Sequence, residues 1–245
     1  MKLLAAGLAS RGIASLRIDK RGIGESASAL ASESELRFQN NADDAIAWVE
    51  TLKTLSGVKC VWLVGHSEGA LVAELVAKQA KDVCGLVLIA GAGRKAGDIL
   101  RDQLGPQLPE PLKQQAFSAI DELEAGRDVP SPPPQLFALF RPSVQPYLKS
   151  WLPLDPAAML ASLKQPVLIV QGTNDLQVSV DDAERLAKAR PGAKLVLLAG
   201  VNHVFKAVPA DRAGNLATYG DPSLPVAPAL IDAVTRFIAS GGADH

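Results

Sequence analysis

The stretch that decides the fold is Val61-Trp62-Leu63-Val64-Gly65-His66-Ser67-Glu68-Gly69-Ala70. An apolar run of strand length leads into a Gly-x-Ser-x-Gly pattern, and a segment with helical periodicity follows. A tight turn from strand to helix strains the backbone at Ser67, so the residues two before and two after it must lack side chains. Gly65 and Gly69 meet that need. The spacing predicts a nucleophilic serine above the carboxyl edge of a parallel sheet, at the positive end of a helix.

Apolar runs of strand length alternate with helix-period segments on both sides of this turn. The alternation predicts an α/β fold in which helices flank a mostly parallel sheet. The expected strands are residues 13–18, 60–65, 85–90, 167–171 and 194–198. The expected helices are residues 43–55, 69–80, 181–189 and 227–239. We also expect an amphipathic helix at the amino end, in preference to an export signal.

Residues 91–166 interrupt this rhythm, because they hold twelve of the 17 prolines. Proline is excluded from central strands and stops helices, so this segment does not continue the sheet. It is too apolar for a linker, and we expect a helical lid inserted between two core regions, residues 1–90 and 167–245. The alternative is an irregular helical excursion with its own small core. The side chains expected to line a substrate pocket under the lid are Phe137, Phe140, Tyr147 and Trp151.

A serine hydroxyl is a poor nucleophile unless a base removes its proton. The chain has 3 histidines from which to choose. The side chain of His66 should point away from the Ser67 hydroxyl, and His245 ends a polar tail. His203 follows a predicted strand, where a base can reach over the sheet edge. We therefore predict that His203 is the base.

The base needs a carboxylate to orient it. Asp175 stands just past the carboxyl end of the strand expected at residues 167–171. The rival pair Asp181-Asp182 opens a helix, where capping and the helix dipole explain acidic residues. The chain order Ser, Asp, His is the one expected for a triad on this fold. Asp175 is the predicted partner, and the backbone N–H of Glu68 is a predicted oxyanion donor.

The glycine-rich loop after the first predicted strand belongs to the same sheet edge. Gly22 and Gly24 allow a tight turn there. Arg21 could pair with Glu68 or Asp19 and brace the site, and a purely structural turn is the alternative.

Taken with these residues, the chain resembles the α/β-hydrolase superfamily and, within it, the bacterial EstD-like carboxylesterases. The stretches that carry the resemblance are residues 16–26 (LRIDKRGIGES), 65–69 (GHSEG), 140–147 (FRPSVQPY), 172–175 (GTND) and 202–203 (NH). It covers nearly the whole chain. The resemblance implies an α/β-hydrolase fold, esterase activity on short acyl esters, a triad of Ser67, Asp175 and His203, and neither cofactor nor metal. A peptidase or thioesterase on the same triad is the alternative activity.

The chain departs from this family at its amino end. Members begin with further strands, and the loop after the third carries a second oxyanion N–H, so the resemblance implies an N-terminally truncated fold. The absent strand would lie between residues 13–18 and 61–64. Either these two pair directly, or a partner chain fills the gap in a homo-oligomer, or the sequence is a truncated product. Losing one oxyanion donor costs roughly 10²–10³-fold in rate, so a weak or silent hydrolase is a further alternative.

Composition limits the partners. With 25 basic and 26 acidic residues the formal charge is −1, which argues against a nucleic-acid partner. No apolar run reaches the roughly 18 residues of a membrane span, and we expect a cytoplasmic protein that acts on a small-molecule ester. Cys60 and Cys84 are too few for a zinc site. We expect buried free thiols, and a disulfide between neighbouring strands is the alternative.

Overall fold

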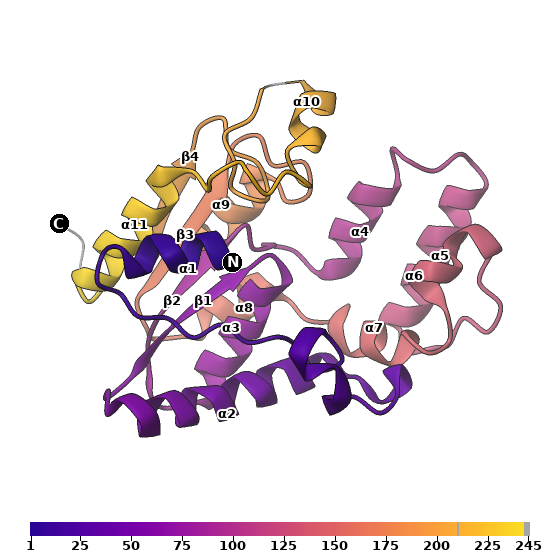
Figure 1. Cartoon of the computed structure of the whole chain (residues 1–245). Coiled ribbons are helices and arrows are strands. Elements are labelled where there is room, and N and C mark those ends of the chain that lie inside the picture. The colour runs from indigo at the N-terminus through magenta and orange to yellow at the C-terminus, as the bar shows by residue number, and fades with distance from the viewer. Residues whose placement is uncertain (210, 243–245) are drawn as a thin grey trace.

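The computed structural model describes residues 1–209 and 211–242, so His245 lies outside the described residues (Figure 1). Within these described residues, four strands form one sheet in the order β1-β2-β3-β4. Their bounds are Val61–His66, Val83–Ile89, Val167–Gly172 and Lys194–Leu198. Every neighbouring pair is parallel, so the carboxyl ends of all four strands meet at one sheet edge. The predicted α/β class and four of the five predicted strands are confirmed.

Helices cover both faces of this sheet (Figure 1). On one face, α2 (Phe38–Ser56), α3 (Glu68–Gln79) and α9 (Val180–Ala189) enclose an apolar cluster. On the other face, α1 (Lys2–Ala9) and α11 (Pro228–Ala239) enclose a second cluster. β3 is buried along its whole length, which explains its uninterrupted apolar sequence. The predicted amino-terminal helix is confirmed as α1, which buries Leu4 and Leu8.

The segment between β2 and β3 is helical. Its elements are α4 (Ala96–Leu104), α5 (Leu112–Glu124), η3 (Pro134–Leu136), α6 (Phe137–Phe140), α7 (Gln145–Trp151) and α8 (Pro156–Ala161). A third apolar cluster, which includes Ile120, Leu123 and Leu152, lies among these helices. By contrast, Leu160 of α8 belongs to the cluster of the sheet. Figure 1 shows α4 to α7 extending to one side of the sheet. The remaining short helices are η1 (Gly24–Ala29), η2 (Glu33–Glu35) and α10 (Arg212–Ala217).

The strand predicted at residues 13–18 is wrong. Within the described residues this segment has no strand pairing, and β1 pairs with β2 alone. A groove separates the segment from β1, so direct pairing between residues 13–18 and 61–64 is also wrong. Leu16 and Ile18 consequently remain exposed. The apolar pattern is typical of a strand, but among the described residues no strand pairs with this segment.

The prediction of free thiols is wrong as well, and the alternative is correct. Cys60 and Cys84 form a disulfide with a Cα–Cα separation of 5.2 Å. Cys60 directly precedes β1 and Cys84 lies in β2, and the register pairs Val61 with Val83. This parallel register brings the two cysteines within bridging distance.

No helix in the described ranges is both long and apolar enough to cross a membrane.

Candidate active site

Ser67 occupies the turn between β1 and α3 with φ 54° and ψ −122°. A positive φ is costly for a residue with a side chain, so the surrounding turn must hold Ser67 in place. A Cβ on Gly65 would lie 2.1 Å from the carbonyl oxygen of Gly69, which excludes any other residue at position 65. A Cβ on Gly69 would meet nothing within 4 Å. Contacts in the turn therefore require only the first of the two glycines.

His203 and Asp175 lie together at the carboxyl edge of the sheet. The Nδ1 atom of His203 is 2.8 Å from Oδ2 of Asp175, and both side chains are almost fully buried. Asp175 follows β3 and His203 follows β4, and these strands are neighbours. Two residues that lie 28 positions apart in the sequence are thereby brought into contact. A carboxylate in this position fixes the tautomer of the imidazole, with Nε2 left as the acceptor.

Asp175 is itself held by several donors. Its Oδ1 accepts the backbone N–H groups of Gln177 at 2.7 Å and Val178 at 3.0 Å. Its Oδ2 also accepts Nε2 of Gln171 at 3.0 Å. These donors satisfy the acceptor sites of the buried carboxylate and together fix its orientation.

The loop that carries His203 is anchored from below by Asn202, which is fully buried. The Nδ2 atom of Asn202 donates to Thr218 at 2.8 Å and to Asn215 at 3.2 Å. Its Oδ1 accepts the backbone N–H of Lys206 at 3.1 Å. The Lys206 ammonium in turn donates to the carbonyl of Thr218 at 2.9 Å. These hydrogen bonds connect the loop to α10. They therefore fix the backbone that carries the His203 side chain.

His66 contributes a contact that the sequence did not predict. Its Nε2 lies 2.8 Å from the carbonyl oxygen of His203, so Nε2 carries the proton and donates it. The two rings are 4.8 Å apart, and the ring of Phe205 lies 5.8 Å from that of His66. Burial, together with the nearby His203, lowers the pKa of His66 to about 4. The neutral ring of His66 thus links the turn at Ser67 to the histidine loop. The only sequence signal was its position next to Ser67.

Glu68 is the first residue of α3, directly after Ser67. Its backbone N–H is among the first four of the helix, which have no acceptor within the helix. Its side chain forms an ion pair with Lys20. The predicted pairing of Arg21 with Glu68 or Asp19 is wrong, because Arg21 binds Asp44 of α2 through two bonds of 2.8 and 2.5 Å. Lys20 and Arg21 are adjacent in this loop, but their side chains bind different partners, Glu68 and Asp44 respectively.

The four aromatic residues predicted for the pocket lie in different environments. Phe140 is 0% exposed within the apolar cluster of the insertion, whereas Phe137 is 50% exposed. Tyr147 and Trp151 pack against Phe38 of α2. The Tyr147 hydroxyl accepts Nδ2 of Asn41 at 3.3 Å, and burial together with the nearby Glu68 raises the pKa of Tyr147. Tyr147 is the one of the four that approaches the elements around Ser67.

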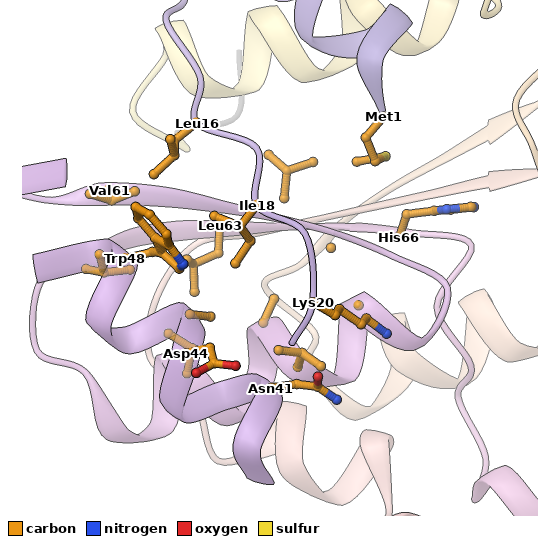
Figure 2. Close-up of a pocket in the computed structure, with 18 of the residues that line it drawn as sticks. Met1, Leu16, Ile18, Lys20, Asn41, Asp44, Trp48, Val61, Leu63 and His66 are labelled. Carbon is orange, nitrogen blue, oxygen red and sulfur yellow. The ribbon is translucent and has the colours of Figure 1, made fainter. Parts of the chain in front are cut away.

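A cavity of about 530 Å³ opens beside Ser67 and runs along β1 (Figure 2). β1 lines one side of the cavity, and Leu16, Ile18, Asp19 and Lys20 from the segment after α1 also line it. α2 closes the bottom with Asp44, Trp48 and neighbouring side chains, and Met1 lies near His66. We call this cavity the β1 groove.

The parallel sheet and the strained strand-to-helix turn are typical of α/β folds that have helices on both faces of the sheet. In such folds, ligands bind outside the carboxyl ends of the strands. The chain belongs to the alpha/beta hydrolase family, whose model matches residues 1–218.

Among curated proteins, the chain is 30% identical over 209 residues to esterase EstD of Thermotoga maritima. That match covers 83% of this chain and 48% of EstD, so the chain spans about half the length of this relative. Among solved structures, it resembles Est1E of Butyrivibrio proteoclasticus with bound ferulic acid, at a TM-score of 0.60 and 17% identity, covering 98% of this chain and 82% of that one. It also resembles the Pyrococcus furiosus esterase Pf2001, at 0.59 and 17%, covering 98% and 76%. These two likenesses concern the fold.

Proposed function

We propose that the protein hydrolyses carboxylic esters through an acyl-enzyme at Ser67. The observation that carries the proposal is the 2.8 Å contact between His203 and Asp175 at the sheet edge where the strained turn holds Ser67. A nucleophile, a base and an orienting carboxylate at one edge are the parts that acyl transfer requires. Similarity to the esterase EstD supports an ester as the substrate.

The proposed reaction has two halves. Nε2 of His203 takes the proton of the Ser67 hydroxyl, whose oxygen attacks the ester carbonyl. Asp175 holds the imidazole and stabilises its charged form. The backbone N–H of Glu68 donates to the oxyanion of the tetrahedral intermediate, which collapses and releases the alcohol. A water molecule activated by His203 then attacks the acyl-enzyme and releases the acid.

In this arrangement the ion pair between Lys20 and Glu68 offsets the charge of the carboxylate that is carried by the residue next to Ser67. A carboxylate free to approach the developing negative charge would oppose it. Tyr147 remains the best candidate for a contact with substrate among the four proposed pocket residues, because it reaches towards Glu68 from the insertion.

The proposal predicts that a fluorophosphonate probe labels the protein stoichiometrically. Ser67→Ala should abolish labelling, because it removes the attacking oxygen. The measurement is intact-protein mass spectrometry after reaction with excess probe. Ser179→Ala is the matched control and should label like the wild type, because Ser179 caps α9. A folded wild-type protein that gains no adduct would refute the nucleophile.

A second assay addresses the substrate class. We expect faster hydrolysis of p-nitrophenyl acetate than of an anilide or a thioester with the same acyl group. Faster cleavage of the anilide would favour a peptidase, and faster cleavage of the thioester would favour a thioesterase.

A further inference from the structure

Gln171 is a polar side chain inside an apolar strand. It is the only polar side chain of β3, which is buried along its whole length, and it is itself 1% exposed. Leucine at this position would bury apolar surface and leave the ladder intact, because strand pairing uses backbone groups. A buried amide is costly unless its polar atoms find partners. The presence of Gln171 must therefore be explained by what its amide contacts.

The amide nitrogen of Gln171 lies among three oxygen atoms. Nε2 is 3.0 Å from Oδ2 of Asp175 and 3.0 Å from the carbonyl oxygen of Val178. It is also 3.2 Å from the carbonyl oxygen of Gly172. If the amide were turned over, Oε1 would face these acceptors and be repelled by all of them. The surrounding oxygens therefore determine which end of the amide faces Asp175.

The other end of the same amide has no partner. Oε1 of Gln171 is buried and accepts no hydrogen bond within the described residues. Gln145 of α7 is similarly buried, at 2%, but it uses both ends: Oε1 accepts the N–H of Val129, and Nε2 donates to the carbonyls of Val129 and Phe140. A buried acceptor without a donor costs free energy, and a functional role is one reason why a fold retains it. The amide of Gln171 thus serves as a donor alone.

The backbone around the site is held by other contacts. The N–H of Asn174 donates to the carbonyl of Val201 at 2.9 Å. A Cβ on Gly172 would lie 2.2 Å from the same carbonyl oxygen, so the end of β3 packs directly against the histidine loop. These contacts join the Asp175 loop to the histidine loop without using Gln171. A role as a simple anchor for the backbone therefore leaves the contact with Asp175 unexplained.

The contact with Asp175 matters because of the oxygen on which it falls. Oδ1 of Asp175 accepts two backbone N–H groups. Oδ2 accepts Nε2 of Gln171 at 3.0 Å and Nδ1 of His203 at 2.8 Å. The amide donor holds Oδ2 in place and takes up part of its negative charge. Less of that charge is then left to stabilise a protonated imidazole.

We propose that Gln171 is a positioning residue that acts on His203 through Asp175. It keeps Oδ2 of the carboxylate aimed at the imidazole and limits how firmly the carboxylate retains a second proton on that ring. The inference rests on the proposed function, in which His203 must be neutral to accept the proton of Ser67. Without the amide donor the protonated ring is stabilised more strongly. The neutral base is then lost at a higher pH.

The first test is the pH dependence of labelling by the fluorophosphonate probe. Gln171→Met keeps the length of the side chain but has no donor. Its plateau rate should fall about tenfold, because the carboxylate loses one constraint on its orientation. The acid side of its pH profile should move up by about one pH unit, because the protonated imidazole is better stabilised. Gln171→Leu should behave in the same way and guards against misfolding of one variant, which circular dichroism detects.

Gln145→Met is the matched control, because it removes an amide that is almost equally buried but lies in the insertion. It should lower the midpoint of urea unfolding, as Gln171→Met should. Its pH profile of labelling should keep the wild-type position, since Gln145 binds only backbone groups of the insertion. The comparison separates a loss of stability, which any buried amide produces, from an effect on the base.

The second test needs no catalysis. The proton between Nδ1 of His203 and Oδ2 of Asp175 is buried and should give a proton NMR signal far downfield, which His203→Gln removes. In Gln171→Met this signal should move further downfield, because the remaining side-chain donor on Oδ2 then forms the stronger bond. In Gln145→Met the signal should stay at its wild-type position.

Two results would overturn the inference. They are a folded Gln171→Met protein whose Nδ1 signal and pH profile both match the wild type, and equal displacements in Gln171→Met and Gln145→Met. Failure of the esterase is recognised separately. A wild-type protein that never labels loses the proposed function, whereas a displaced Nδ1 signal in Gln171→Met still shows that Gln171 acts on His203. A wild type that labels, with Gln171 variants that label identically at every pH, keeps the esterase and removes the positioning role.

Discussion

At the scale of single residues, His66 connects the turn at Ser67 with the loop that carries His203. Its ring stays neutral down to a pH of about 4, because burial and the neighbouring histidine oppose a charge. In the unfolded chain the same ring takes up a proton near its ordinary pKa of 6.5. The unfolded state therefore gains protons before the folded state as the pH falls, and stability is lost between these two values.

We predict that acidification from pH 7 to pH 4 removes about 3 kcal/mol of unfolding free energy through His66. His66→Gln keeps a donor for the carbonyl of His203 but cannot titrate, so it should lose that much less over the same interval. Urea unfolding of both proteins at the two pH values measures the difference. Equal losses in both would show that His66 does not hold this low pKa.

At the scale of elements, the disulfide fastens β1 to β2 where the strands begin. It closes a loop with a sequence separation of 24 residues, which contains β1 and α3. Because such a cross-link restricts the unfolded chain, it should stabilise the fold by about 3 kcal/mol. The bond also holds β1 in register although, among the described residues, β2 is its only strand neighbour.

We expect dithiothreitol to lower the midpoint of urea unfolding by an amount equivalent to that stabilisation. A Cys60→Ser/Cys84→Ser variant should match the reduced protein and not respond to the reductant. Titration of thiols in guanidinium chloride gives an independent check. Two reactive thiols in the unreduced wild type would contradict the disulfide.

The elements also show what the sequence could predict. β1 to β4 lie within two residues of the expected ranges, because continuous apolar runs bounded by turns identify buried parallel strands. The contact between Asp175 and His203 could be expected as well, since each follows a strand whose carboxyl end lies at the same edge.

The incorrect predictions concern which of several nearby residues or strands a given residue contacts. The segment at residues 13–18 has a strand pattern, but a pattern states nothing about the distance to the next strand. The pairing of Cys60 with Cys84 depends on register, and the pairing of Lys20 rather than Arg21 with Glu68 depends on how one loop turns. Phe140 is an aromatic residue of the kind that lines apolar pockets, but it is buried in the insertion's own apolar cluster.

At the scale of the whole molecule, one buried ion pair joins the start of the insertion to the sheet domain. The side chain of Asp182 in α9 is 0% exposed and binds Arg94 through bonds of 2.9 and 3.0 Å. Burial alone would raise the pKa of Asp182, but its bonds to Arg94 and Ser179 hold that pKa below its ordinary value. Asp182 is thus a structural carboxylate, which agrees with the choice of Asp175 over it as the partner of His203.

We predict that Arg94→Met destabilises the protein by about 3–5 kcal/mol, because Asp182 is left buried without its cationic partner and keeps only its hydrogen bonds to Ser179 and Gly93. The double variant Arg94→Met/Asp182→Asn should recover part of the loss, since no charge is then buried. Urea unfolding at pH 7 compares the three proteins, with Arg127→Met as the control at an exposed pair. A loss below 1 kcal/mol in Arg94→Met would show that this ion pair contributes little to the attachment of the insertion.

The position of Met1 has a practical consequence. Met1 lines the β1 groove near His66 and so lies at the carboxyl edge of the sheet (Figure 2), whereas Gly242 packs near Pro166 and Trp62 at the opposite edge. An affinity tag joined to the amino end would emerge beside Ser67 and compete with whatever enters there. A tag after α11 would leave that entrance open.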